Sequence, residues 1–286
     1  MHTIILDTDI GSDVDDALAL ATVLGSESVN LLGITTVYGD TKLRARIAHH
    51  LCHIANKSIP VFAGVETPLS GRKVWSTGSE GKAFSNLNQY ALEDRKAVEF
   101  LVEAVNQNPG EIEVIAIGPL SNIATAIVQA PNFAKNVKHL WIMGGDFTKE
   151  KIEHNFKCDV DAAKIVLESE ISITILDLPS SQKTIIKKDE IEQIKNSGKL
   201  GPILHTEILN WIQPRHQDWT TPHDPIAVLA MLEPEFFDFS EIGSVQISED
   251  GKSDWHLNED GNVKRVSPSK PLEAVSAMIS LIAKVN

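Results

Sequence analysis

The junction between the first apolar segment and the first helix constrains this chain more than any other feature. Residues 3–6 form an apolar run typical of a buried strand, and residues 17–24 form an apolar helix. Five carboxylates lie within the ten residues of the junction: Asp7, Asp9, Asp13, Asp15 and Asp16. Such crowded like charges raise one another's pKa unless a positive charge lies among them. A bound divalent cation is the simplest such charge.

Helix capping is the simpler alternative for these acids. Ser12 as the N-cap and Asp15 at the third helical position would form a capping box. Acids in a first helical turn also stabilise the helix by about 0.3–1 kcal/mol each. Capping gives no reason for Asp7 and Asp9, which precede the helix on the strand end. A metal or substrate site therefore explains the pattern better.

Short apolar runs alternate with longer helical patterns along the whole chain. The predicted strands are 3–6, 29–37, 61–63, 113–117, 139–143, 173–178 and 242–247. The predicted helices are 17–24, 43–55, 97–106, 122–129, 161–167, 203–212, 224–232 and 271–285. Strands separated by helices pair in parallel through right-handed crossovers. We expect one α/β domain over residues 1–286, with a mostly parallel open sheet and helices on both faces. The polar stretch 248–262 is predicted to form a hairpin with residues 263–266.

Composition excludes several classes of partner. The net charge of −13 argues against nucleic acid, because binding a phosphate backbone favours a basic face. No apolar run approaches the roughly 18 residues of a membrane span, and the N-terminus lacks the pattern of a signal peptide. Cytoplasm is the expected location. The two cysteines, Cys52 and Cys158, are expected to be buried thiols rather than a disulfide or a zinc site.

Polar and glycine residues follow several predicted strands at the point where each strand ends. Asp7 and Asp9 follow the first, Gly39-Asp40 the second, and 118–119 and 144–146 later ones. Ligands of open α/β sheets bind outside the carboxyl ends of the strands. These groups are therefore predicted to converge on one site.

Two known types of acidic loop fit the junction poorly. An EF-hand loop starting at Asp7 requires glycine and glutamate where Ser12 and Leu18 stand. A phosphatase loop of the haloacid-dehalogenase type would use Asp7 as nucleophile. It expects Thr or Val where Gly11 stands, and it gives residues 15–17 no role.

The junction resembles the N-terminal signature of the inosine-uridine-type nucleoside hydrolases. That signature is Asp-x-Asp-x-Gly followed by Asp-Asp-Ala, and this chain has 7–11 followed by 15–17. Five further segments resemble the family in the same order: 33–40, 60–69, 117–124, 143–159 and 223–227. The last of these reads His-Asp-Pro-Ile-Ala. The resemblance covers most of the chain and implies a nucleoside hydrolase-like fold.

By this resemblance the protein hydrolyses the N-glycosidic bond of a ribonucleoside with Ca²⁺, releasing base and ribose. The implied Ca²⁺ ligands are Asp9, Asp16, Asp224 and the carbonyl of Ile117. Asp9 is the implied general base, and His223 the candidate acid for the leaving base. The implied sugar-binding residues are Asp15, Asn155, Asp40 and, at the 5′-hydroxyl, Glu153. The chemistry agrees, because a hard cation with oxygen ligands activates water and holds hydroxyls. A homodimer or homotetramer and a role in nucleoside catabolism or purine salvage are also implied.

The chain departs from the family pattern in several places. Its acidic loop is two residues longer, so either Asp15 or Asp13 is the sugar-binding acid. Asp40 stands where the family has Asn, and an ionised carboxylate cannot donate a hydrogen bond. Phe147 falls where an Asn would touch the 5′-hydroxyl, and Thr77 where many members have His. The residues expected near the base are Trp75, Trp211, Arg215, His216 and Trp219. They do not identify the base.

Two other functions remain open at this point. A non-catalytic ribose- or nucleoside-binding protein on the same scaffold would tolerate the departures at Asp40, Phe147 and Thr77. A Mg²⁺-dependent phosphatase would use Asp7 as nucleophile, but it leaves Asn155 and Asp224 without roles. Release of free ribose from a ribonucleoside would separate the hydrolase from the binding protein.

Overall fold

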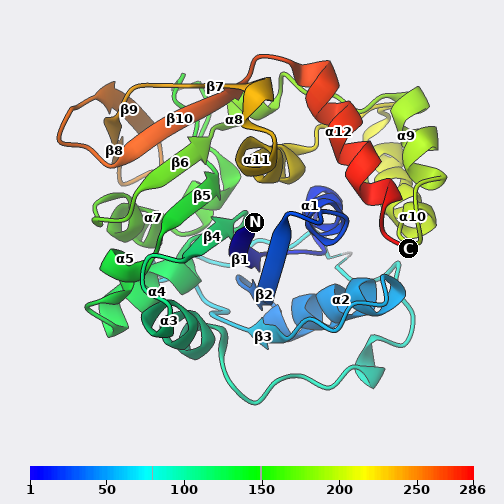
Figure 1. Ribbon diagram of the computed structural model, residues 1–286, viewed down its shortest axis with the longest axis horizontal. Coiled ribbons are helices and arrows are strands. Elements are labelled where there is room, and N and C mark those ends of the chain that lie inside the picture. The colour runs from blue at the N-terminus through cyan, green and yellow to red at the C-terminus, as the bar shows by residue number, and fades with distance from the viewer. Residues whose placement is uncertain (79, 149) are drawn as a thin grey trace.

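A ten-stranded, mostly parallel sheet organises the computed structural model, which describes residues 1–78, 80–148 and 150–286 (Figure 1). The spatial order is β3-β2-β1-β4-β5-β6-β10-β8-β9, and β7 pairs with β10. The strands are β1 (His2–Thr8), β2 (Val29–Thr36), β3 (Val61–Ala63), β4 (Ile112–Ala116), β5 (His139–Met143), β6 (Ile173–Leu176), β7 (Phe237–Phe239), β8 (Gly243–Ile247), β9 (Ser253–Leu257) and β10 (Val263–Pro268). The strands from β3 to β10 along this order are parallel, whereas β7, β8 and β9 are antiparallel to their neighbours.

Helices cover both faces of the sheet, as the sequence predicts. The helices are α1 (Asp15–Leu24), α2 (Thr41–Ile54), α3 (Ala97–Gln107), α4 (Ser121–Gln129), α5 (Phe133–Asn136), α6 (His154–Cys158), α7 (Val160–Leu167), α8 (Leu178–Ser181), α9 (Lys188–Lys195), α10 (Gly201–Ile212), α11 (His223–Leu232) and α12 (Pro271–Ala283). Figure 1 shows α1, α2, α11 and α12 on one side and α3, α4, α5 and α7 on the other. Alternate residues of a strand face opposite sides. Accordingly Ile4 and Leu6 of β1 join one apolar core, and Ile5 joins the other.

The chain changes direction across the sheet at β1. From β1 it runs through β2 to β3 at one edge, then returns through α3 to β4 on the other side of β1. Such a switch point opens a crevice at the carboxyl ends of the two strands. Asp7 is in register with Thr35 of β2 and Ala116 of β4. The acidic junction therefore begins at this crevice.

The structure corrects two details of the predicted elements. The hairpin partner of β8 is β9, which lies inside the stretch expected to be a polar connection, and β10 pairs mainly with β6 and β7. The strand predicted over 173–178 ends at Leu176, because Asp177 caps α8 by accepting from the Ser180 N–H. Strand β9 was not predicted because most of its residues are polar, and an edge strand exposes much of its surface.

The cysteines and the lengths of the helices complete the description of the fold. Cys52 and Cys158 are both free and buried. Among the described residues, no helix is long and apolar enough to cross a membrane.

Candidate active site

A cavity of about 360 Å³ lies at the carboxyl end of the sheet beside the acidic junction. It is lined by Asp9, Ser12, Asp13, Asp15, Asp16, Trp75, Ile117, Met143, Ile152, Glu153, His154, Asn155, Leu178, Trp211, His223 and Asp224. These residues come from the ends of β1, β4 and β5 and the starts of α1, α6, α8 and α11. Trp75 comes from the long connection after β3, and Trp211 from the last turn of α10. Segments far apart in the sequence therefore meet here as the strand-end pattern predicts.

Three buried carboxylates form a compact group in this cavity. One oxygen each from Asp15, Asp16 and Asp224 lies within 4.8 Å of the others. Burial, followed by repulsion from neighbouring acids, raises the pKa of all three carboxyl groups well above the ordinary value. An all-oxygen, negatively charged and buried donor set suits a hard divalent cation. The residues present therefore fit the cation that the sequence predicts, with Asp15 rather than Asp9 completing the group.

Asp9 lies on the wall of the same cavity and is only 7% exposed. Arg44 of α2 lies close to Asp9, with its Nη2 3.8 Å from Oδ2 of Asp9. The guanidinium also donates to the backbone carbonyls of Asp9 and Ile10 and to the Ser12 hydroxyl. Arg44 was not identified from the sequence, because an arginine in a helical pattern is usually solvated. Here it fixes the backbone of the acidic loop.

The capping alternative for the loop is wrong. The residue preceding α1 is Val14, and among the described residues no side chain caps this helix. The Ser12 hydroxyl instead accepts from Arg44. Asp15 and Asp16 do occupy the first helical turn, but both are buried and face the cavity. Helix stabilisation therefore does not account for the crowding.

Asp7 supports the site without lining its cavity. It is fully buried, and its Oδ1 accepts from the Thr35 hydroxyl at 2.5 Å and from Asn122 Nδ2 at 2.7 Å. Its Oδ2 has no hydrogen-bond partner among the described residues. Burial raises the pKa of Asp7 to about 7. A side chain this enclosed cannot attack a phosphoester, so the geometry gives no support to Asp7 as a nucleophile.

Asn155 and Glu153 of the sugar-binding set line the cavity from α6. Asn155 Nδ2 donates to the carbonyls of Ile117 and Met143 at 3.0 and 3.1 Å. The Ile117 carbonyl keeps a second lone pair, so it remains free to coordinate a cation. Glu153 caps α6, and its carboxylate accepts from three backbone N–H groups. Burial raises the pKa of Glu153 despite those bonds.

His223 begins α11 directly before Asp224 and lines the cavity. Its Nδ1 lies 2.7 Å from the Ser181 hydroxyl, and that hydroxyl donates to the Leu178 carbonyl. Nδ1 therefore donates to Ser181, and Nε2 of the neutral ring carries no proton. Burial lowers the pKa of His223 to about 4.

Other candidate residues lie outside the cavity. Asp40 is exposed and caps α2 by accepting from the Leu43 N–H at 2.9 Å. Phe147 packs beneath Arg265, whose guanidinium carbon lies 5.1 Å from the ring centre. Neither residue lines the site.

The residues expected near the base divide into two groups. Trp75 and Trp211 line the site cavity. Arg215 stacks on Trp211, with its guanidinium carbon 3.3 Å from the ring centre, and lines a neighbouring cavity of about 490 Å³. Asp13 and Trp211 border both cavities, whereas His216 and Trp219 line neither. Burial raises the pKa of Asp13 to about 8.

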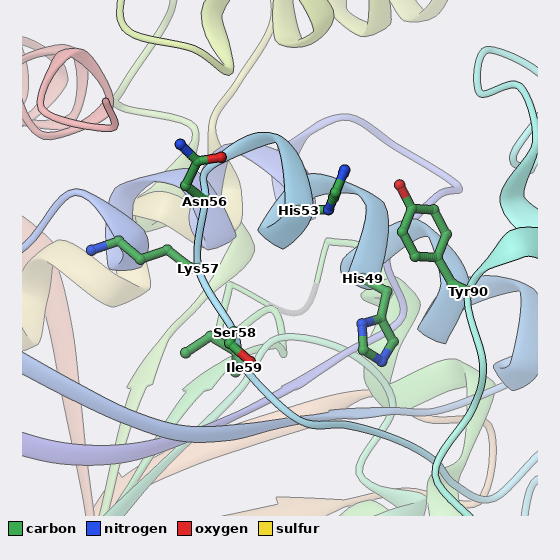
Figure 2. Close-up of a pocket in the computed structure, with 7 residues that line it drawn as sticks. All are labelled: His49, His53, Asn56, Lys57, Ser58, Ile59 and Tyr90. Carbon is green, nitrogen blue, oxygen red and sulfur yellow. The ribbon is translucent and has the colours of Figure 1, made fainter.

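A further cavity of about 350 Å³ lies at the far end of α2 (Figure 2). It is lined by His49, His53, Asn56, Lys57, Ser58, Ile59 and Tyr90, and shares no residue with the acidic site. Figure 2 shows Lys57 extending away from Tyr90. Since no carboxylate lines this cavity, it offers no alternative position for the hard cation.

Comparison with known proteins now decides the family. The family description "Inosine-uridine preferring nucleoside hydrolase" matches residues 4–273. The chain belongs to this family. The resemblance inferred from the sequence is thereby confirmed, and with it the enzyme class, a hydrolase of N-glycosyl bonds.

Relatives of this nucleoside hydrolase include plant and bacterial proteins. A probable uridine nucleosidase 2 of Oryza sativa subsp. japonica is 31% identical, over 94% of this chain and 85% of the relative. A pyrimidine-specific ribonucleoside hydrolase of Escherichia coli is 29% identical, over 73% of this chain and 69% of the relative. The solved structure of a plant nucleoside hydrolase covers 99% of each chain, with a TM-score of 0.88 and 25% identity. The predicted α/β fold is confirmed.

Proposed function

We propose that this nucleoside hydrolase is Ca²⁺-dependent and cleaves the N-glycosidic bond of a ribonucleoside to free base and ribose. The observation that carries the proposal is the buried group of Asp15, Asp16 and Asp224 inside a cavity of nucleoside size. Acids this crowded require a bound cation to stay ionised at neutral pH. Oxygen-only donors favour Ca²⁺ or Mg²⁺ over softer metals.

The proposed Ca²⁺ ligands are Asp16, Asp224, the Ile117 carbonyl and Asp9. Asp15 is a competing ligand, because its oxygen lies with those of Asp16 and Asp224. When bound, the cation neutralises these acids, lowers the pKa of an attached water and anchors sugar hydroxyls. Asp9 accepts the proton of the attacking water. Arg44, 3.8 Å from Asp9, holds that carboxylate in place.

The groups that bind the sugar are hydrogen-bond acceptors. Asp15 accepts from a ribose hydroxyl, and Asp13 is the alternative. The burial of Asp15 in the cavity wall supports the first choice, since Asp13 is only half-buried and borders the neighbouring cavity as well. Asn155 has both amide protons directed to carbonyls, so its oxygen remains as an acceptor. A carboxylate and an amide oxygen together suit a vicinal diol.

His223, which lines the same cavity, contacts the leaving base. Because Nδ1 donates to Ser181, Nε2 delivers a proton to the base only when the ring is doubly protonated. Trp211, which also lines the cavity, provides a stacking surface for the base. Two relatives are named for uridine or for pyrimidine ribonucleosides, which makes uridine the first substrate to assay. A cytoplasmic homodimer or homotetramer acting in nucleoside catabolism or purine salvage completes the proposal.

Release of reducing sugar from uridine, cytidine, inosine and adenosine tests the function directly. We expect ribose release from at least one of them, loss of turnover in chelator, and recovery with Ca²⁺. The Asp9→Asn variant should still bind Ca²⁺ through the remaining ligands but lose turnover by about 10²–10⁴-fold, the contribution of a general base. Nucleoside binding without ribose release in the Ca²⁺-loaded protein would contradict a hydrolase and identify a binding protein.

A further inference from the structure

The connection after β3, residues 64–96, contributes one side chain, Trp75, to the lining of the site cavity. Among its described residues the only regular element is a single 3-10 turn, Leu87–Gln89. A segment without a backbone ladder of its own is positioned by its contacts with the rest of the fold. Trp75 is 48% exposed although it lines a cavity, so a bound nucleoside can cover the open part of its ring. The contacts that hold this segment therefore bear on how the nucleoside is bound.

The first part of the connection is anchored by Asp159, the residue between α6 and α7. Its carboxylate accepts from the N–H groups of Leu69 and Ser70 at 2.7 and 3.1 Å. It also accepts from the Ser121 hydroxyl, and it is fully buried. The chain is thus fixed as far as Ser70.

Arg72 provides the next anchor. Its Nη1 donates to the Lys157 carbonyl at 3.0 Å, and its Nη2 donates to the Glu249 carbonyl at 2.6 Å. A longer contact of 3.4 Å joins Nη1 to the Asp250 carbonyl. Lys157 belongs to α6, and residues 249 and 250 belong to the turn between β8 and β9. One guanidinium therefore ties together the connection, α6 and the β8–β9 turn.

The β8–β9 turn packs closely against a second residue of the cavity wall, Ile152. Gly251 in this turn has a φ of +101°, and a Cβ placed there would lie 3.2 Å from Ile152 Cγ2 and 3.3 Å from Lys157 Cα. The Gly251 N–H donates to the Ser248 carbonyl at 3.0 Å and closes the turn. The turn is therefore confined by its neighbours, and Arg72 fastens the connection to it.

Trp75 follows Arg72 after only two residues. The Trp75 N–H donates to the Tyr38 hydroxyl oxygen at 2.7 Å, and Tyr38 is hydrogen-bonded in turn to the Cys158 thiol of α6. Val74 packs against the apolar cluster that contains Tyr38 and Cys158. The position of the Trp75 ring is therefore set by Arg72 on one side and by Tyr38 at its own backbone.

We propose that Arg72 is a positioning residue for nucleoside binding, which holds Trp75 against the bound nucleoside by tying the connection after β3 to α6 and to the β8–β9 turn. The inference rests on the proposed function for its substrate. Arg72 does not line the cavity, so it acts on the nucleoside through Trp75. The groups proposed for proton transfer, Asp9 and His223, lie on other elements. Arg72 therefore governs KM and leaves kcat nearly unchanged, as expected for a contact made equally in the ground state and the transition state.

The test measures kcat and KM with uridine, or with whichever ribonucleoside the enzyme hydrolyses. We expect Trp75→Ala to raise KM about tenfold, the effect of losing an aromatic contact. Arg72→Met should raise KM about fivefold, with kcat within about twofold of wild type. Arg72→Lys should raise KM nearly as much, because one ammonium group cannot reproduce the fork of a guanidinium. Arg95→Met is the matched control, since Arg95 packs over Phe62 and Phe100, and it should leave KM unchanged.

The double variant Arg72→Met/Trp75→Ala separates positioning from general stability. If Arg72 acts through Trp75, the double variant has the KM of Trp75→Ala within about twofold. Two effects that multiply, to a rise of about 50-fold, would overturn the inference, because independent sites add in free energy. A loss of kcat in Arg72→Met with KM unchanged would also overturn it, since that result indicates less folded enzyme.

Fluorescence tests the same tie without turnover. In substrate-free protein, Arg72→Met should increase the acrylamide quenching of tryptophan fluorescence, and the increase should vanish in a Trp75→Phe background. Equal quenching in wild-type and Arg72→Met protein contradicts the inference while leaving the hydrolase intact. Absence of ribose release from every ribonucleoside by the Ca²⁺-loaded wild-type protein contradicts the proposed function instead, and the quenching result then still decides whether Arg72 holds Trp75.

Discussion

Buried acids occur at both ends of the same sheet, but their negative charges are compensated in different ways at the two ends. Glu113, near the amino end of β4, is only 3% exposed. It accepts from Lys138 Nζ, His2 Nδ1 and Trp141 Nε1, each at 2.9 Å. These donors hold the pKa of its carboxyl group below the ordinary value although burial opposes them. The protein itself compensates this charge.

At the carboxyl end, the acids face mainly one another. The pKa of Asp16 is raised by burial and by its acidic neighbours, and the Thr8 hydroxyl and the charge of Arg44 offset this only in part. The presence or absence of hydrogen-bond donors from the protein therefore distinguishes a structural acid from a functional one. A buried carboxylate with its own donors stabilises the fold, whereas buried carboxylates without them require a ligand to supply the charge.

The largest expected effect comes from removing one acid of the site. Asp16→Asn should lower kcat/KM for ribonucleoside hydrolysis by about 10³-fold or more, since it removes a proposed cation ligand. In chelator the same variant should melt at a higher temperature than wild-type protein, because one of the repelling charges is gone. Ribose release and thermal melting measure the two effects. A variant that melts lower in chelator and keeps its activity would contradict the contrast between the two ends.

The pH dependence of stability should also distinguish the two ends. In chelator the folded protein binds more protons than the unfolded chain near neutral pH, because the pKa values of the site acids are raised in the folded state, that of Asp7 to about 7. The free energy of unfolding therefore falls as pH rises from 4 to 7, by up to roughly 1.4 kcal/mol per pH unit for each extra proton. Saturating Ca²⁺ should reduce this fall to the part contributed by Asp7, which lies outside the cavity. Urea unfolding at several pH values checks it, and an identical pH profile with and without Ca²⁺ would count against the cation site.

Glu113→Gln should affect stability but not catalysis. Replacing the carboxylate leaves its donors without a charged acceptor, at a cost of about 1.5–3 kcal/mol in the free energy of unfolding. Because the pKa of Glu113 is lowered in the folded state, this contribution is present above pH 4–5 and is lost as pH falls further. Urea unfolding at pH 7 measures the change, with the exposed Glu103→Gln as control. A large loss of kcat/KM in this variant would show that the two ends are coupled.

The smallest expected effect is that of Asp40→Asn. Asp40 is exposed and caps α2, and asparagine caps a helix about as well as aspartate. Activity and melting temperature should stay within a factor of two and about 2 °C of wild type. A strong loss of activity would show instead that Asp40 binds the sugar, as expected from the sequence.

The same site shows which functional residues could be predicted from the sequence alone. The position of Asp9 at the end of the first strand predicted a site there, and the resemblance to the family added Asn155, His223 and Asp224 to it. They do line one cavity, because parallel strands bring their carboxyl ends to one edge. The position of Asp40 was not predictable, since a residue at a strand end can equally cap the next helix. Arg44 was missed because helical periodicity does not reveal which cation is buried.

The sequence by itself determined the family, the α/β fold and, with the exception of Asp40, the acids that share the cavity. These follow from local patterns, since strand and helix periodicity and short motifs are properties of neighbouring residues. Only the tertiary structure decided how the acids divide. It placed Asp15 with Asp16 and Asp224, buried Asp7 against Thr35 and Asn122, and linked Trp75 to His154 through Tyr38 and Cys158. Burial and hydrogen bonding between distant segments set the charge of each acid, and no local pattern encodes them.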